Sequence, residues 1–339
     1  MYKEKLPFGE PIFFKGQYKQ DKIYDLYIQM LTCSFKLKKD KIPCIQIKDS
    51  KSFFVPNEYL ESSNGEIICL VLTSVDLKLF LEQYDVFDLN YVSGWKFKSI
   101  SGLFTEYIDK WIAKKNEATI NKNKGIRAMS KLMLNSLYGK FATTLTTKSK
   151  TPYLTKDGIV KYKLTEEQEK NGLYLPVACF ITAYARNKTI RTSQAIKTYS
   201  INKYGKDMYI YSDTDSIKTT LPVEELKQFC DIDNVKLGFW KDEGTAIRGK
   251  FVRQKCYLEE FKINYFGKKL AKAKKFNKKV CVKSYKTLTK IQITSAGMPK
   301  SCYQFVNWDT FKTGFSCGGK LTFNHVKRWC YFKGNRVYY

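Results

Sequence analysis

The stretch Tyr211-Ser-Asp-Thr-Asp-Ser216 places two carboxylates one residue apart between two apolar segments. The sequence around it, residues 208–219, predicts a strand, an acidic turn and a second strand. Carboxylates on such a turn can hold divalent metal at a phosphoryl-transfer site, where they must converge on one point. Thr214 and Ser216 are expected to hold the turn through local hydrogen bonds. An isolated Asp-Thr-Asp is more often a plain surface turn, so the interpretation depends on its neighbours.

A helix is predicted from about residue 125 to residue 141. Its polar stripe contains Arg127, Lys131, Asn135 and Tyr138, and a second stripe contains Ile126, Met133 and Leu137. The polar stripe suits an incoming nucleotide, because its basic side chains can bind phosphates and its tyrosine can pack against a sugar or base. The alternative is a solvated basic face, which is what most such stripes are.

Two further basic features lie downstream. Lys255 and Tyr257 are predicted to alternate on a strand and to face one way, where they can grip a phosphate or sugar of a nucleic-acid strand. The lysine-rich run from Lys268 to Lys279 is most simply a solvated loop that adds sequence-independent phosphate contacts.

The composition is strongly basic. The 339 residues carry 60 Lys+Arg against 32 Asp+Glu, a net charge of +28, which indicates a protein that binds a polyanion such as nucleic acid. No apolar run is long enough to span a membrane, so no membrane partner is expected. The ten cysteines form no metal-binding pattern and are interpreted as reduced thiols of a cytoplasmic protein. The single histidine, His325, makes Ser-His or Cys-His catalysis improbable.

Residues 9–100 read mostly as strands, for example residues 23–37 and 67–75. Helical spacing begins at about residue 103 and returns at residues 177–200. Between the helical segments, residues 143–176 contain an Asp157-Gly158 turn that predicts a projecting β-hairpin.

The stretch Lys131–Gly139 resembles the K-x3-N-S-x-Y-G motif of family B DNA polymerases, and Tyr211–Ser216 resembles their Y-x-D-T-D-S motif. The chain is more closely similar to the protein-primed members of bacteriophages. Shorter matches follow in order along the chain: Leu6–Pro11, Ile45–Lys48, Asn57–Leu60, Gly102–Phe104, Ile108–Trp111, Phe180–Ala183, Arg253–Lys255 and Ala296–Met298.

The resemblance implies a DNA-directed DNA polymerase that adds dNTPs to a primer 3′-OH on primer-template DNA. It implies that Asp213 and Asp215 are catalytic carboxylates that bind Mg²⁺, with two ions expected and Mn²⁺ as a substitute. The expected nucleotide contacts are Lys115, Arg127, Lys131, Asn135 and Tyr138. The expected DNA contacts are Tyr211, Thr214, Lys255 and Tyr257.

The resemblance also implies an α+β palm-fingers-thumb fold with two β-rich insertions, without the N-terminal part of the palm and the exonuclease domain. The implied division is residues 1–8, end of the N-terminal palm segment; 9–102, insertion that meets the priming terminal protein; 103–142, fingers; 143–176, hairpin insertion for strand displacement; 177–298, palm; and 299–339, thumb.

The family places a first carboxylate motif, D-x2-S-L-Y-P, upstream of the point where this chain begins. Asp85–Asn90 is superficially similar to it but lacks Ser-Leu-Tyr-Pro and lies where the family has its insertion. We therefore expect half of a metal site, to be completed by an upstream segment or by a separate upstream polypeptide. Such a chain would work in the cytoplasm of a phage host.

Two alternatives remain. The chain can be a non-catalytic remnant that holds DNA or terminal protein without polymerising. A polymerase that copies RNA fits less well, because reverse transcriptases usually carry adjacent Asp-Asp where this chain has Asp-Thr-Asp.

Overall fold

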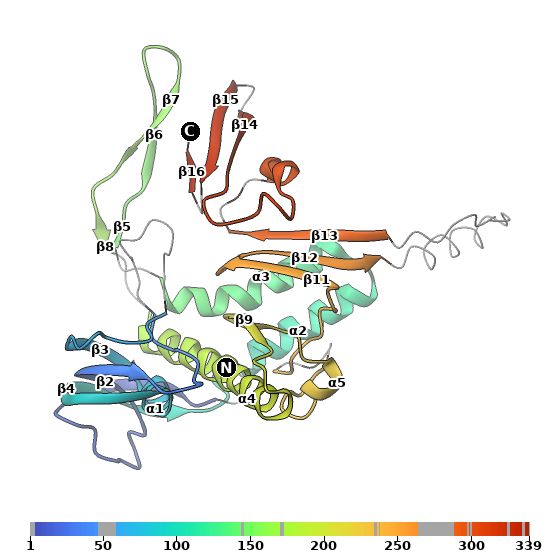
Figure 1. Ribbon diagram of the computed structural model, residues 1–339. Helices are drawn as coiled ribbons and strands as arrows, with labels where there is room; N and C mark the ends of the chain where they lie inside the picture. Colours follow the sequence, from blue (N-terminus) through green and yellow to red (C-terminus); the bar gives the residue numbers. More distant parts are fainter. Residues whose placement is uncertain are drawn as a thin grey trace. The chain divides into compact units, whose positions relative to one another are not determined.

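The chain forms two compact units, each of which is described by itself. The first comprises Met1–Ile45 and Tyr59–Ser216, and the second Gln46–Glu58 and Ile217–Tyr339 (Figure 1). The computed structural model describes residues 4–46, 59–143, 146–169, 173–233, 236, 238–263, 288–296, 298, 300–323, 326–333 and 336–338. The predicted lysine-rich run 268–279 and His325 lie outside the described residues.

The main sheet of the first unit has four antiparallel strands in the order β1-β4-β2-β3. Their bounds are Leu6–Lys15 for β1, Leu26–Leu37 for β2, Ile68–Thr73 for β3 and Tyr84–Ile100 for β4. Gly94 lets β4 pass between its neighbours, because a Cβ there would collide with the Ile28 carbonyl oxygen and the Phe14 ring. The β-rich character predicted for residues 9–100 is confirmed.

One helix in this region was not predicted. Residues 67–75 read as a single strand, but β3 ends at Thr73 and α1 runs over Ser74–Gln83. The Thr73 hydroxyl accepts a hydrogen bond from the Asp76 amide at 3.1 Å, which caps the first turn of the helix. The local pattern Thr-x-x-Asp is therefore the signal that separates the strand from the helix.

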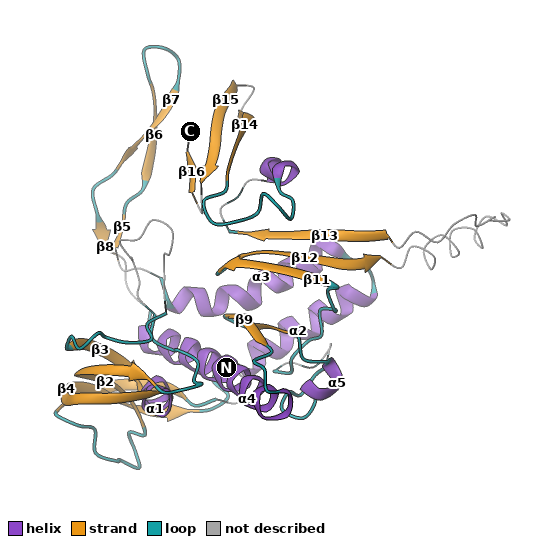
Figure 2. Cartoon of the chain, in the orientation of Figure 1, coloured by secondary structure: helices purple, strands orange, loops and turns teal. Residues whose placement is uncertain are grey.

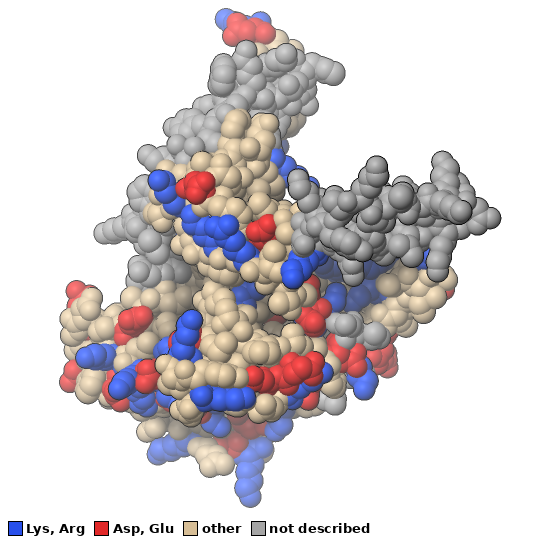
Figure 3. All heavy atoms as spheres, turned by 45° about the vertical axis from the view of Figure 1, so that its right-hand side comes forward, with Lys and Arg blue, Asp and Glu red and all other residues tan. Residues whose placement is uncertain are grey.

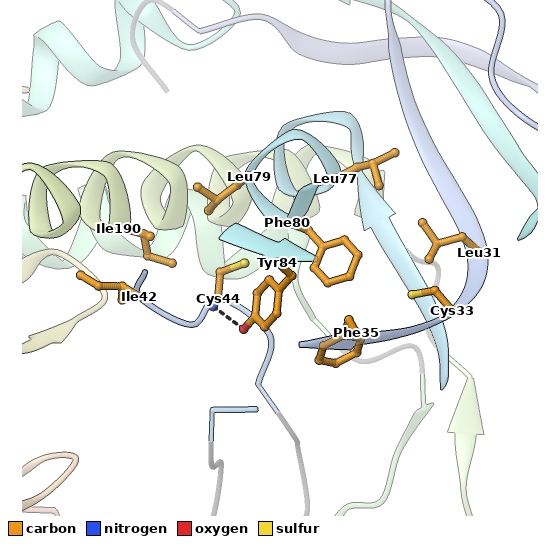
Figure 4. Packing of buried hydrophobic residues seen from close by; sticks show 10 residues of the cluster. All are labelled: Leu31, Cys33, Phe35, Ile42, Cys44, Leu77, Leu79, Phe80, Tyr84 and Ile190. Carbon is orange, nitrogen blue, oxygen red and sulfur yellow. Dashed lines mark hydrogen bonds between the residues drawn. The ribbon is translucent and has the colours of Figure 1, made fainter. Parts of the chain in front are cut away.

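The core of the first unit packs α1 against the sheet and against a long helix, α4, over Leu175–Tyr204. Figure 4 shows Phe35, Phe80 and Tyr84 together, with Ile190 of α4 at one edge. The Tyr84 hydroxyl accepts from the Cys44 amide at 3.0 Å. A second cluster joins strand residues to the start of α4: Leu6, Leu26, Phe97, Val177, Phe180 and Ile181. The sheet therefore serves as a base for α4.

The first unit also contains two shorter helices and two small ladders. The predicted helices are confirmed as α2, Thr105–Ile120, and α3, Lys124–Phe141. The predicted hairpin is confirmed as β6, Lys150–Leu154, and β7, Val160–Leu164, with Gly158 at a φ of +71° in its turn. The strands β5, Thr146–Thr147, and β8, Gln168–Glu169, pair at its base. None of the helices in the described residues is both long and apolar enough to cross a membrane.

Strands dominate the second unit (Figure 2). One antiparallel sheet contains β11, Arg248–Arg253, β12, Cys256–Ile263, and β13, Leu288–Ser295. Its core holds Cys256, Leu258, Met298, Cys302 and Phe311. This unit also contains α5, Val223–Leu226, a 3-10 helix at Lys300–Phe305, and a sheet of β14, Ser316–Phe323, β15, Val326–Lys333, and β16, Arg336–Tyr338.

Candidate metal and nucleotide site

The Asp-Thr-Asp stretch forms the predicted hairpin. The strand β9 covers Tyr209–Asp213 and β10 covers Ser216–Thr219, so the turn consists of Thr214 and Asp215. Thr214 adopts a φ of +52°, a left-handed conformation that is costly for a β-branched residue and that must be held by its surroundings.

Three hydroxyl groups hold this turn. The Ser216 hydroxyl donates to the Asp213 carbonyl oxygen at 3.1 Å, and the Thr214 hydroxyl donates to the Asp213 carboxylate at 3.1 Å. From outside the hairpin, the buried Thr189 of α4 donates to the Thr214 carbonyl oxygen at 2.8 Å. The predicted local hydrogen bonds of Thr214 and Ser216 are confirmed, whereas Thr189 was not predicted, because nothing in the local sequence shows its partner.

The two carboxylates differ in environment. Asp213 ends a strand and is half-buried, whereas Asp215 lies in the turn and is exposed. Burial raises the pKa of Tyr59 and of Tyr209, and the negative charge of Asp213 raises the pKa of Tyr59 further. The Tyr209 hydroxyl is 2.9 Å from the Ser212 hydroxyl. Asp213 therefore lies near Tyr59, and both tyrosines stay protonated at neutral pH.

Arg186 lies in the same neighbourhood, because its positive charge opposes the rise in the pKa of Tyr59. Its guanidinium contacts the Asp76 carboxylate at 2.6 Å, which ties α4 to the first turn of α1. Arg186 was not predicted, although it lies three residues beyond the Phe180–Ala183 match.

The predicted nucleotide stripe lies on one exposed face of α3. Arg127, Lys131, Asn135 and Tyr138 are all exposed, and Tyr138 is 36% exposed. In the second stripe, Ile126 is 46% exposed, and the residue that α3 buries is Ser130. Met133 and Leu137 are half-buried.

The helices α2 and α3 brace each other. The Tyr107 hydroxyl of α2 donates to the Met133 carbonyl oxygen of α3 at 3.1 Å, and the Phe104 and Phe141 rings meet with centroids 5.4 Å apart. Lys115, the predicted phosphate contact on α2, is half-buried. The long helix α4 packs against both α3 and β9, so it joins α3 to the acidic hairpin.

Lys255 and Tyr257 belong to the second unit, and the prediction that both alternate on one strand is wrong. Lys255 is exposed in the two-residue turn between β11 and β12, with a φ of +56°. The turn follows from the pairing of Arg253 with Cys256, and its Gln254-Lys255 sequence carries no Asn-Gly signal. Tyr257 is on β12, stacked on Phe251 with centroids 5.2 Å apart. Tyr211 is half-buried on β9.

The stretch superficially similar to the first carboxylate motif belongs to a different strand. Asp88, from the stretch superficially similar to the first carboxylate motif, lies on β4 and accepts from the Ser34 hydroxyl at 3.1 Å. Within the described ranges, no group of three or more histidine, cysteine, aspartate or glutamate residues is arranged to hold a metal ion.

Several cysteines act as core residues. Burial raises the pKa of the Cys33 thiol to about 11 and of the Cys44 thiol to about 12, so both stay protonated at neutral pH. Both thiols lie in the hydrophobic core of the first unit. On the face shown in Figure 3, Lys and Arg side chains are interspersed with Asp and Glu instead of forming one patch.

The model of the type B DNA polymerases of organelles and viruses matches residues 1–231. The DNA polymerase of Bacillus phage PZA is 41% identical over 93% of this chain and 51% of its own length. The DNA polymerase of Streptococcus phage Cp-1 is 32% identical over 96% of this chain and 52% of its own length.

Solved structures agree with these relatives. A phi29 DNA polymerase complex with primer-template DNA and incoming nucleotides matches with a TM-score of 0.78 and 38% identity, over 98% of this chain and 55% of that one. The chain thus spans about half the length of the curated relatives it matches. With a mixed α/β fold and a family match over more than half of its residues, the chain belongs to the organellar and viral type B DNA polymerases.

Proposed function

We propose that this chain carries the nucleotidyl-transfer centre of a DNA-directed DNA polymerase, which adds dNTPs to a primer 3′-OH. The observation that supports it most is the Asp213-Thr214-Asp215 turn, fixed to α4 by the Thr189 hydroxyl in a chain of this family. A strained turn held from outside keeps its carboxylates in place without help from substrate.

Asp213 and Asp215 fit a magnesium site. Mg²⁺ is commonly bound through one or two carboxylates, with substrate phosphates and water completing its oxygen ligands. The exposed Asp215 and the half-buried Asp213 together supply two carboxylates. An ion held by these two carboxylates would lower the pKa of the primer hydroxyl and would neutralise charge on the leaving pyrophosphate. A further carboxylate from an upstream segment or polypeptide is part of the proposal.

The exposed stripe of α3 binds the nucleotide. Lys131 and Arg127 hold its phosphates as charge-assisted donors, and Lys115 of α2 adds a third cation. Asn135 and Tyr138 line the pocket for sugar and base. Tyr211 and Thr214 contact DNA beside the metal, and Lys255 with Tyr257 holds the primer end.

The remaining assignments extend the proposal to the whole fold. Residues 103–142 act as fingers, residues 177–298 as palm and residues 299–339 as thumb, and residues 1–8 form the end of the N-terminal palm segment. The sheet within residues 9–102 meets a priming terminal protein, and the hairpin within residues 143–176 aids strand displacement. Because the relatives belong to phages of Bacillus and Streptococcus, the expected location is the cytoplasm of a bacterial host.

Primer extension tests the proposal. The purified chain is incubated with Mg²⁺, dNTPs and a primed template, with and without the polypeptide encoded upstream. Incorporation that is lost in Asp213→Ala and kept in Glu224→Gln, which changes an exposed carboxylate of α5, supports it. No incorporation under either condition contradicts it.

A non-catalytic remnant is the second candidate. It predicts DNA binding that weakens with salt, as the +28 charge requires, and no effect of Asp213→Ala on any assay. Parallel reactions on DNA and RNA templates decide which template is copied.

A further inference from the structure

We propose that the ion pair between Lys218 and Glu259 is a positioning device for the Tyr257 ring. Neither residue belongs to the motifs that mark the site. The pair lies within the second unit and joins β10, the strand that leaves the acidic turn, to β12, the strand that carries Tyr257. The consequence for the primer end rests on the proposed function.

Lys218 contacts both Glu259 and Tyr257. Its ammonium lies 2.7 Å from the Glu259 carboxylate and 5.5 Å from the centroid of the Tyr257 ring. Tyr257 and Glu259 are two residues apart on β12, so they share one face of the strand. One cation therefore fixes two neighbouring side chains of that face, the carboxylate through an ion pair and the ring through its π face.

The neighbouring strand β11 supports the Tyr257 ring from the side. Phe251 pairs with Tyr257 across the strands, and their rings stack with an interplanar angle of 28°. Gly249 pairs with Glu259, and a Cβ at Gly249 would lie 2.9 Å from the Phe251 ring. The missing side chain thus leaves room for Phe251 to lie along the strand and meet Tyr257.

The burial of the Glu259 carboxylate determines which anion Lys218 binds. The Glu259 side chain is 6% exposed and the Lys218 side chain is 21% exposed. A buried carboxylate needs a partner, since leaving it unpaired is strongly unfavourable. Lys218 is therefore committed to Glu259 and is not a phosphate contact, although it lies three residues from Asp215.

A fluorine label gives a readout that needs no activity. With 3-fluorotyrosine incorporated at position 257, the ¹⁹F NMR signal of the full chain reports the charge and packing around that ring. We expect the signal to move in Lys218→Met and in Glu259→Gln and to stay in Lys218→Arg. Lys227→Met is the matched control, because it removes the exposed pair of Lys227 with Glu224.

Primer binding gives the functional readout. In Lys218→Met, the Tyr257 ring loses its cation–π contact and becomes less ordered. We therefore expect the affinity for the primer end to fall by about tenfold, with the KM for dNTP unchanged. Lys218→Met/Glu259→Gln leaves no buried charge unpaired, so it separates loss of positioning from loss of folding.

The outcomes are distinct. An unchanged ¹⁹F signal in Lys218→Met and in the double variant overturns the proposal and leaves a purely structural pair. A moved signal with unchanged primer binding overturns the link to the primer. If the wild-type chain fails to extend primers, the proposed function fails, yet the ¹⁹F signal still decides whether Lys218 positions Tyr257.

Discussion

The β9–β10 hairpin and the β11–β12 hairpin both turn through two residues, and neither turn contains glycine. In each, one residue adopts a positive φ: Thr214 at 52° in the first position and Lys255 at 56° in the second. A left-handed conformation costs an L-residue about 1–2 kcal/mol, so both turns are held by their surroundings.

The two turns are held in different ways. Side-chain hydroxyls hold the first, including Thr189 from α4. A backbone bond helps to hold the second, because the Ala296 amide next to β13 donates to the Lys255 carbonyl oxygen at 3.0 Å. Substitution of these hydroxyl side chains can therefore loosen the acidic turn. Substitution of Lys255, in contrast, changes its side chain and leaves the backbone hydrogen bond of the second turn in place.

Removing the Asp213 carboxylate should have the largest effect. We expect Asp213→Ala to lower the rate of primer extension by a factor on the order of 10³, because metal stabilisation of the transition state is worth several kcal/mol. Single-turnover incorporation measures the rate. Primer-template affinity should change far less, and an equal loss of both would mean that the turn serves binding instead of chemistry.

Alkaline pH should weaken the first hairpin through Tyr209. Burial raises the folded-state pKa of Tyr209 above 10, so its contribution to stability is full below pH 10 and is lost as pH rises through the folded value. Each tyrosine with a raised pKa contributes at most about 1.4 kcal/mol of lost stability per pH unit.

Unfolding by guanidinium at several pH values from 8 to 12 measures this loss. The pH dependence should be shallower in Tyr209→Phe, whereas the exposed Tyr153→Phe of the β6–β7 hairpin should follow the wild type. A Tyr209→Phe curve parallel to the wild type would show that the tyrosine is not coupled to folding.

Local signals predicted much of this architecture from the sequence. The helices α3 and α4 follow from apolar periodicity, and the β6–β7 turn follows from Asp157-Gly158. What could not be predicted depends on distant partners. Thr189 matters because Thr214 folds onto it, and Glu259 is tolerated in a buried position because Lys218 meets it.

The Lys255 error has the same origin. Alternation places residues 255 and 257 on one face only if the strand continues, and the strand breaks because Arg253 pairs with Cys256. In contrast, the acidic turn was predicted correctly because its residue types also serve as turn formers.

Thr189→Val tests the anchor of the first hairpin. Valine keeps the volume of this buried side chain but cannot donate to the Thr214 carbonyl oxygen, so stability should fall by about 1 kcal/mol. Thr189→Ser retains the hydroxyl and should keep most of the primer-extension rate. If the turn is held by Thr189, the rate should fall in Thr189→Val by more than in Thr189→Ser, and equal rates would assign the anchor to the hydroxyls of the hairpin itself, Thr214 and Ser216.

Lys255→Gly should give the smallest change in stability, and in the opposite direction. Glycine adopts a positive φ without strain, and its greater freedom in the unfolded chain offsets part of the gain, so we expect a stabilisation of about 0.5 kcal/mol. Lys255→Arg keeps both the strain and the charge and should leave stability unchanged.

Because the Lys255 side chain is exposed, any loss of primer binding in Lys255→Gly but not in Lys255→Arg comes from the missing charge and not from the fold. Destabilisation by glycine would instead mean that the lysine stem packs against the turn and stabilises it more than the strained φ costs.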